Sequence, residues 1–156
     1  MKNIRTILVL LSVIFFSYGC LKQVELTPEK KNFQYNYKVA GKSKKEIWVS
    51  ARNHFAMVYG DVRSVMSVQD EERGTLIGKG LVGWTLNAMG TLISCHQAYS
   101  IRFDADDGRA KLKLTLIEGP PPLSKCRGWS VPSEEGYEDI KANFRELDKD
   151  LRDALR

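Results

Sequence analysis

The residues that could carry out acid–base or metal chemistry are few and scattered along the sequence. His54 and His96 are the only histidines. One falls within a predicted helix and the other opens a predicted strand, and neither has a cysteine or carboxylate at zinc-ligand spacing. Cys95 and His96 are neighbours, so on a strand they point to opposite faces and cannot form a thiolate–imidazole pair. We therefore predict no catalytic set, no metal site and no cofactor.

A second chemical signal is the acidic run that ends in Gly108. Asp104, Asp106 and Asp107 have the spacing with which a calcium loop begins, but no Glu follows at the required position. The sequence thus favours a binding or scaffold module over an enzyme. An envelope enzyme or enzyme subunit, with its site near residues 83–94, stays as the alternative.

The start of the chain has the pattern of an export signal. Lys2 and Arg5 precede an apolar run over residues 7–16, broken only by Ser12. About ten apolar residues fit a secretory signal and are too few to span a bilayer as a helix.

Cys20 directly follows Gly19 and this apolar run, which resembles the bacterial lipobox. The resemblance implies that residues 1–19 are a lipoprotein signal peptide and that Cys20 carries lipid. Ser17 stands where the lipobox usually has Leu. Because Leu21 is not Asp, the comparison with proteobacterial lipoproteins implies the outer membrane, facing the periplasm. The alternative is ordinary cleavage nearby, with Cys20 as a free thiol.

The charge of the mature chain is too mild for a nucleic-acid protein. Removing residues 1–19 takes away two of the 24 basic residues and leaves 19 acidic ones, so the net charge falls to +3. A nucleic-acid protein would show a concentrated basic stripe. The partners we expect are the membrane, through a lipid anchor, and an envelope protein; nucleic acid is not expected.

The first half of the mature chain reads as a tether followed by a strand and a helix. Residues 20–32 are polar and predict a tether, although a short strand over 23–26 also fits. Residues 33–156 form the single predicted domain. Alternating aromatics predict a strand over 33–40. Ser43 and Glu46 form a capping box that begins a helix, which Gly60 ends. The apolar stripe of this helix is Ile47, Trp48, Ala51, Phe55 and Val58.

Two strands, over 62–69 and 75–82, are predicted around a turn at 70–74. Met66 and Val68 are expected on one face. Gly78 and Gly80 predict a close approach of another element, for which we expect the helix. Residues 83–94 lack a clear period and predict a mobile excursion, whose exposed Trp84 is a candidate contact for a partner.

The second half predicts a hairpin, a proline-rich loop and a last helix. Residues 96–104 and 109–118 alternate around the turn at 106–108, with Phe103 expected near Ala110. Three prolines interrupt the loop that follows, and a helix with an apolar stripe begins after Ser133. The outer face of the hairpin is basic and is a candidate electrostatic binding surface. Its residues are Arg102, Arg109, Lys111 and Lys113.

Cys95 and Cys126 are an even pair in an exported chain and are disulfide candidates. Cys95 has the same parity as Tyr99, so it should point into the domain. The proline-rich loop must fold back for the last helix to dock, which can bring Cys126 near it. Two unpaired buried thiols are the alternative.

This order of elements predicts an α+β domain, an antiparallel sheet with helices packed on one face. The capping box at Ser43, the charged turn before Gly74 and the 99–116 hairpin resemble an uncharacterised family of exported bacterial proteins with a TATA-binding-protein-like (TBP-like) fold. The resemblance covers about residues 33–118. It implies a fold and no activity, because a shared fold does not carry DNA binding with it.

Overall fold

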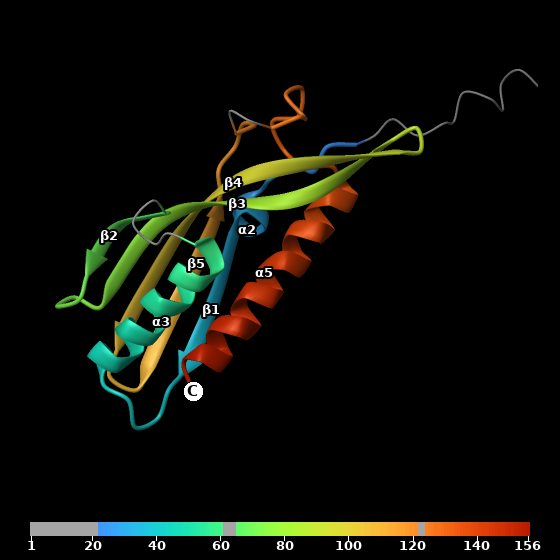
Figure 1. The fold of residues 1–156 in the computed structure, drawn as a ribbon. Coiled ribbons are helices and arrows are strands. Elements are labelled where there is room, and N and C mark those ends of the chain that lie inside the picture. Colours follow the sequence, from blue (N-terminus) through green and yellow to red (C-terminus); the bar gives the residue numbers. More distant parts are fainter. Residues whose placement is uncertain (1–21, 61–64, 122–123) are drawn as a thin grey trace, which may run out of the picture.

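The computed structural model describes residues 22–60, 65–121 and 124–156. They form an antiparallel sheet of five strands in the order β1-β5-β4-β3-β2 (Figure 1). This is the α+β fold that the sequence predicted. The strands are β1 (Asn32–Lys38), β2 (Met66–Asp70), β3 (Thr75–Ala88), β4 (Thr91–Asp106) and β5 (Arg109–Leu116). The helices are α2 (Pro28–Lys31), α3 (Lys44–Tyr59) and α5 (Glu134–Ala154). In this part of the chain, no helix is both long and apolar enough to cross a membrane.

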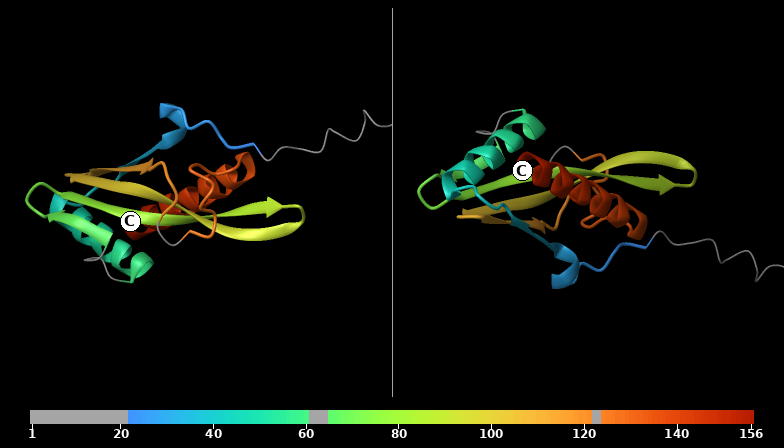
Figure 2. Two further views of the ribbon diagram at one scale, coloured as in Figure 1. Left: turned by 90° about the horizontal axis from the view of Figure 1, so that it is seen from above. Right: turned by 90° about the horizontal axis from the view of Figure 1, so that it is seen from below.

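Both long helices lie on one face of the sheet, as the right view of Figure 2 shows. The predicted capping box at the start of α3 is present, with Ser43 Oγ accepting from the Glu46 amide and Glu46 accepting from the Ser43 amide. Four of the five predicted stripe residues are buried, whereas Val58 is exposed and His54 is buried instead. In the last turns of α3 the buried face therefore includes His54, and Val58 lies on the exposed side.

Helix α5 runs diagonally across the other part of this face (Figure 1). The apolar stripe predicted for this helix is buried against the sheet, and only Leu147 is partly exposed. The other stripe residues are Tyr137, Ile140, Phe144, Leu151 and Leu155. Phe144 packs edge-on against Phe33 of β1 and Tyr99 of β4, with ring centroids 4.9 Å apart in both pairs. The aromatic residues therefore join α5 to the edge strand β1 and to the central strand β4.

The prediction of a mobile excursion over residues 83–94 is wrong. These residues complete β3 and begin β4, and they pair in unbroken register from Gly83↔His96 to Ala88↔Thr91. The two-residue turn between them is Met89-Gly90, and both residues have positive φ. Trp84 and Leu86 alternate with Thr85 and Asn87 as in a half-buried strand, but this pattern is short. The Met89-Gly90 turn and the exposed Leu92 interrupt it, so it was missed.

The glycines of β3 do admit a close neighbour, but it is not helix α3. A Cβ on Gly80 would lie 2.6 Å from Cζ of Tyr99, whose ring crosses the glycine. This crossing lets the Tyr99 hydroxyl share a hydrogen bond with the Tyr59 hydroxyl of α3. Burial raises the pKa of both phenols. Gly78 is crowded by the backbone at Val65, which leads into β2.

Strand β2 is shorter than the predicted 62–69 strand, and residues 62–64 lie outside the described residues. A register shift between Met66 and Val68 changes which side chains face the core. Met66 is buried and Val68 is exposed, so the prediction that they share a face is wrong.

The tether predicted for residues 20–32 is corrected from Lys22 onward, because this segment packs on the domain. Gln23 forms a β-bridge with Ser133, and the amide of Val24 donates to the carbonyl of Pro132 at 2.9 Å. Val24 is buried in the core, and α2 leads directly into β1. The segment packs on the domain because Val24, an apolar residue in an otherwise polar stretch, is removed from water beside the start of α5. Cys20 and the predicted signal at 1–19 lie outside the described residues.

The predicted disulfide is confirmed: Cys95 and Cys126 are bonded, with their Cα atoms 5.6 Å apart. The register of the β4–β5 hairpin differs from the prediction by two residues, because Phe103 pairs with Leu112 and not near Ala110. The turn lies one residue later than predicted, at Asp107-Gly108, and Cys95 is beyond the end of β5, where the returning loop reaches it.

Candidate binding surface

The face of the sheet opposite the helices is left without a helical cover. Along each strand, the side chains that alternate with the core point to this outer face, and α5 lies behind the sheet in the left view of Figure 2. Lys111 and Lys113 lie here on β5, beside Arg102 on β4, and all three are exposed. This face holds the basic residues that the sequence analysis singled out.

Trp84, the other predicted contact residue, is not on any surface. It is 3% exposed and points to the helical side of the sheet. Its ring lies against Gly136 of α5 and edge-on to Trp129, with centroids 6.1 Å apart. The prediction of Trp84 as a binding residue is therefore wrong, because its place in the pleat directs it into the core.

Two of the four predicted basic residues are engaged in ion pairs on the outer face. Arg102 contacts both carboxylate oxygens of Asp104, at 2.7 and 3.0 Å. Arg109 Nη2 lies 2.6 Å from Asp106 Oδ2, and hydrogen bonding to Arg109 holds the pKa of Asp106 below its usual value. These pairs are exposed, so they neutralise charge locally and add little stability.

Lys111 and Lys113 carry the remaining charge of this surface. Within the described residues, no carboxylate lies within ion-pair distance of either ammonium group, nor of that of Lys38 on β1. Lys113 pairs across the ladder with Arg102, and like charges directly opposite each other are unfavourable. Sequence reasoning missed Lys38, although its alternation with Tyr37 and Val39 placed it on this face.

Lys38 and Lys111 line a groove of about 710 Å³ at the end of the sheet where β4 turns into β5. The lining residues are Asn36, Tyr37, Lys38, Lys44, Arg73, Asp104, Ala105, Asp106, Arg109, Ala110 and Lys111. Because both carboxylates of the groove are paired with arginines, its free charges are positive. We call Lys38, Lys111 and Lys113, together with this groove, the basic surface.

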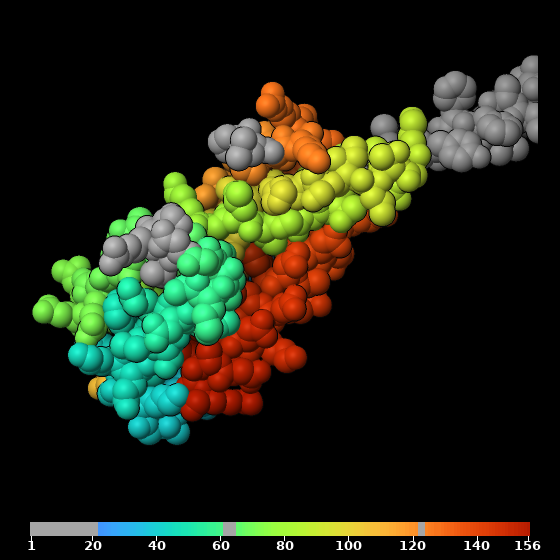
Figure 3. Space-filling view, in the orientation of Figure 1, coloured from blue at the N-terminus to red at the C-terminus, as the bar shows by residue number. Residues whose placement is uncertain are grey.

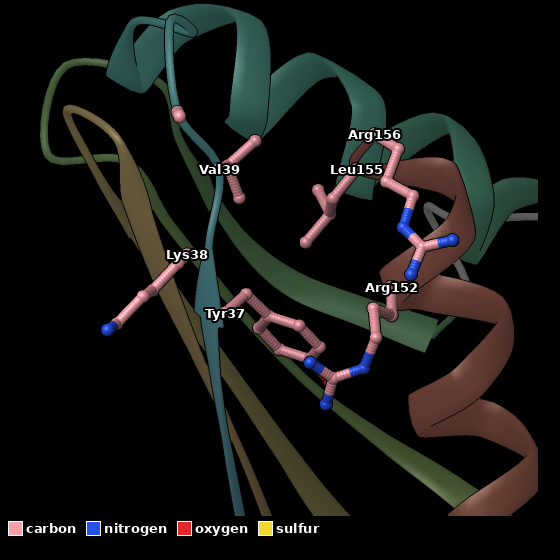
Figure 4. A pocket seen from close by; sticks show the side chains of 7 residues that line it. Tyr37, Lys38, Val39, Arg152, Leu155 and Arg156 are labelled. Carbon is pink, nitrogen blue, oxygen red and sulfur yellow. The ribbon is translucent and has the colours of Figure 1, made fainter.

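A smaller pocket of about 260 Å³ opens on the opposite side of β1, at the end of α5 (Figure 4). The guanidinium of Arg152 lies 5.1 Å above the centre of the Tyr37 ring. Arg152 is also paired with Asp148, and Lys38 points away from this pocket toward the outer face. The pocket thus offers less unpaired charge than the basic surface.

The groups considered for catalysis are not brought together. Cys95 is in the disulfide, His54 is buried on α3 and His96 is exposed on the outer face of β4. Burial lowers the pKa of His54. Across the described ranges, no three His, Cys, Asp or Glu side chains are close enough to hold a metal ion. Residues 83–94, where the alternative places an enzyme site, form a paired hairpin and not a loop.

Residues 33–118 match a family described as a domain of unknown function (DUF4468) with a TBP-like fold. The chain belongs to this family. The match covers the strands and helix α3, and it stops before Cys126 and α5. No curated protein matches the sequence.

Two solved structures share the fold of this DUF4468 chain. One is a TBP-like protein from Parabacteroides distasonis, with 15% sequence identity and a TM-score of 0.63 over 83% of this chain and 96% of that one. The other is a DUF4468 family protein from Bacteroides ovatus, with 15% identity and a TM-score of 0.57 over 85% of this chain and 90% of that one. At this identity the likeness concerns the fold.

Proposed function

We propose that this protein is a lipid-anchored module of the bacterial cell envelope that binds an acidic partner through its basic surface. One observation carries the binding part. The helices leave a whole sheet face open, and on that face the acidic residues near the groove are paired while Lys38, Lys111 and Lys113 are not. A carboxylate-bearing protein or polymer of the envelope has the complementary charge.

The anchoring part rests on the sequence. Cys20 follows a short apolar run and Gly19, and a lipid there would place the domain at the outer membrane, facing the periplasm. Lys22 already contacts α5 through its side chain and its carbonyl, so little chain separates Cys20 from the folded domain. The domain would be held close to the bilayer and not on a long tether.

Mass measurement and cell fractionation of Cys20→Ser test the anchor. The parent protein should fractionate with membranes and carry the extra mass of lipid, and the variant should lose both. A variant that stays membrane-bound with the mass of the parent would overturn the anchoring.

Charge reversal tests the basic surface. A crosslinking amino acid placed at Gln34, on the outer face beside Lys113, should capture an acidic envelope partner in cells. Lys111→Glu with Lys113→Glu should abolish that capture. The matched control is Arg145→Glu with Lys149→Glu, two exposed residues of α5, which should leave it intact.

Salt provides an independent readout with the captured partner. Contacts between exposed charges weaken as the screening length falls from about 10 Å at 0.1 M salt to about 3 Å at 1 M. Binding that is indifferent to salt, or equally weakened by both charge-reversed pairs, would show that the partner binds elsewhere.

A further inference from the structure

The hairpin arm formed by the ends of β3 and β4 projects past the rest of the domain (Figures 1 and 3). The last hydrogen bond from β3 to α5 among the described residues is at Thr85, whose amide donates to Asp139 Oδ2 at 2.9 Å. Leu86, the next residue, is still buried in the core. Beyond that point β3 and β4 pair only with each other, up to Ala88↔Thr91. We call residues 87–92 the hairpin tip.

The hairpin tip is uncharged in a protein of which 28% is charged. Residues 80–101 contain no Asp, Glu, Lys or Arg. At the outermost point the side chain of Met89 is fully exposed, and Leu92 is 71% exposed. Burying this surface in an apolar environment costs no charge dehydration, because it carries no charged side chain.

The conformation of Met89 strengthens this observation. It has φ of 52°, the one positive φ at a non-glycine residue in the described chain. Turns that need positive φ favour Asn, Asp or Gly at this position. Asn87 and Gly90 fit such a turn, and Asn87 Oδ1 accepts the amide of Gly90 at 3.1 Å. A large apolar side chain is therefore presented at the apex where the local backbone favours a small polar one.

The hairpin tip lies at the same end of the molecule as the first described residues. Lys22 contacts Glu134 at the start of α5, and Gly136 in the same turn contacts Trp84 of β3. The two views of Figure 2 agree in placing the tip and the entry of the chain at one end. Cys20 lies two residues before Lys22, a reach of at most about 7 Å.

We propose that the hairpin tip inserts Met89 and Leu92 into the lipid surface of the membrane, as a second point of attachment. The proposal rests on the anchoring by Cys20 proposed above, which would hold this end of the domain at the bilayer. The narrow apex suits lipid and not a protein, since a specific protein interface needs about 800 Å² from each partner. The first turn of α5 places Glu134 and Glu135 at this end, so attachment would be apolar, to zwitterionic lipid.

Insertion can be measured by the quenching of a tryptophan at the tip. Met89→Trp is prepared as the lipidated full chain in phosphatidylethanolamine–phosphatidylcholine vesicles that contain bromine-labelled lipid. Met57→Trp is the matched control, because Met57 is 75% exposed and belongs to α3, a helix that lies away from this end (Figure 1). After subtraction of the signal of the parent tryptophans, quenching at position 89 should exceed that at 57 by several-fold. Leu92→Trp repeats the test outside the strained turn.

Equal quenching at positions 89 and 57 would overturn the insertion while leaving the anchor intact, provided that the protein floats with the vesicles. A blue shift at position 89 in the Cys20→Ser background without vesicles would also overturn it, since without the lipid it would indicate contact with a second copy. The two proposals are separated by Cys20→Ser, which removes the anchor alone. Adding Met89→Asp and Leu92→Asp to that variant should lower its residual vesicle partition by about ten- to a hundredfold, from the loss of two buried apolar side chains.

Discussion

Gly136→Ala is the substitution that tests the docking of α5 on the sheet most directly. Gly136 lies in the first turn of α5, where its amide donates to the Ser133 side chain at 3.0 Å. A Cβ at this position would lie closer than 3.0 Å to Cε3 of Trp84, and 3.0 and 3.1 Å from two further ring atoms. Trp84 cannot withdraw easily, because its ring is buried and packed against Trp129.

Two effects of this substitution oppose each other. Alanine in place of glycine stabilises a helix interior by up to about 1 kcal/mol, and less in the first turn. Forcing a methyl group into a filled core costs about 1–3 kcal/mol. Because the obstructing atoms belong to a rigid indole and not to the end of a flexible chain, we expect the steric cost to exceed the helix gain. The net loss in the free energy of unfolding should be about 1–2 kcal/mol, or roughly 3–6 °C in Tm.

Thermal and urea unfolding of the purified protein measure this loss. The control is Gly83→Ala on the same strand as Trp84, where a Cβ meets nothing within 4 Å. It should be neutral or stabilising by up to about 1 kcal/mol. Trp84→Phe should cost less in the Gly136→Ala background than in the parent, because it removes the obstructing atoms. A Gly136→Ala protein as stable as the parent would refute the packing described here.

Three further predictions concern stability. The Cys95–Cys126 bond closes a loop with a sequence separation of 31, so its reduction should lower the free energy of unfolding by about 3–4 kcal/mol. Urea unfolding with and without reductant measures this loss, and overlapping unfolding curves would contradict it. Burial places the pKa of His54 below its ordinary 6.5, so the unfolded chain binds the proton first and stability should be lost as the pH falls through about 6.5. His54→Gln should reduce this loss between pH 7.5 and 5, and an unchanged pH profile would show that other groups cause it. Ser43→Ala removes the capping box and should cost about 1 kcal/mol in thermal unfolding, whereas Ser50→Ala, in the middle of α3, should cost less.

The sequence by itself determined the elements whose signals are local. The capping box at Ser43 and the stop at Gly60 fixed α3, and the period of the apolar stripe fixed α5. Strict alternation placed Lys111 and Lys113 on the outer face of β5. The sequence also named Cys126 as the candidate partner of Cys95, with two unpaired thiols as the alternative, and the structure shows the bond. These features depend on residues close together in the chain, or on a single long-range requirement.

Only the tertiary structure decided the features that depend on what lies across the sheet. The alternation within residues 83–94 is short and is interrupted by the Met89-Gly90 turn. The pairing of β3 with β4 past the end of β5 shows that these residues are strands. Trp84 and Val24 are buried because the start of α5 covers them. The residues next to them in the sequence do not predict this burial. Free charge on the outer face also depends on contacts, because ion pairing takes Arg102 and Arg109 but leaves Lys111 and Lys113. The reason is physical: burial and charge pairing are set by the groups that meet in space, and the chain's own pattern records only which face each side chain can take.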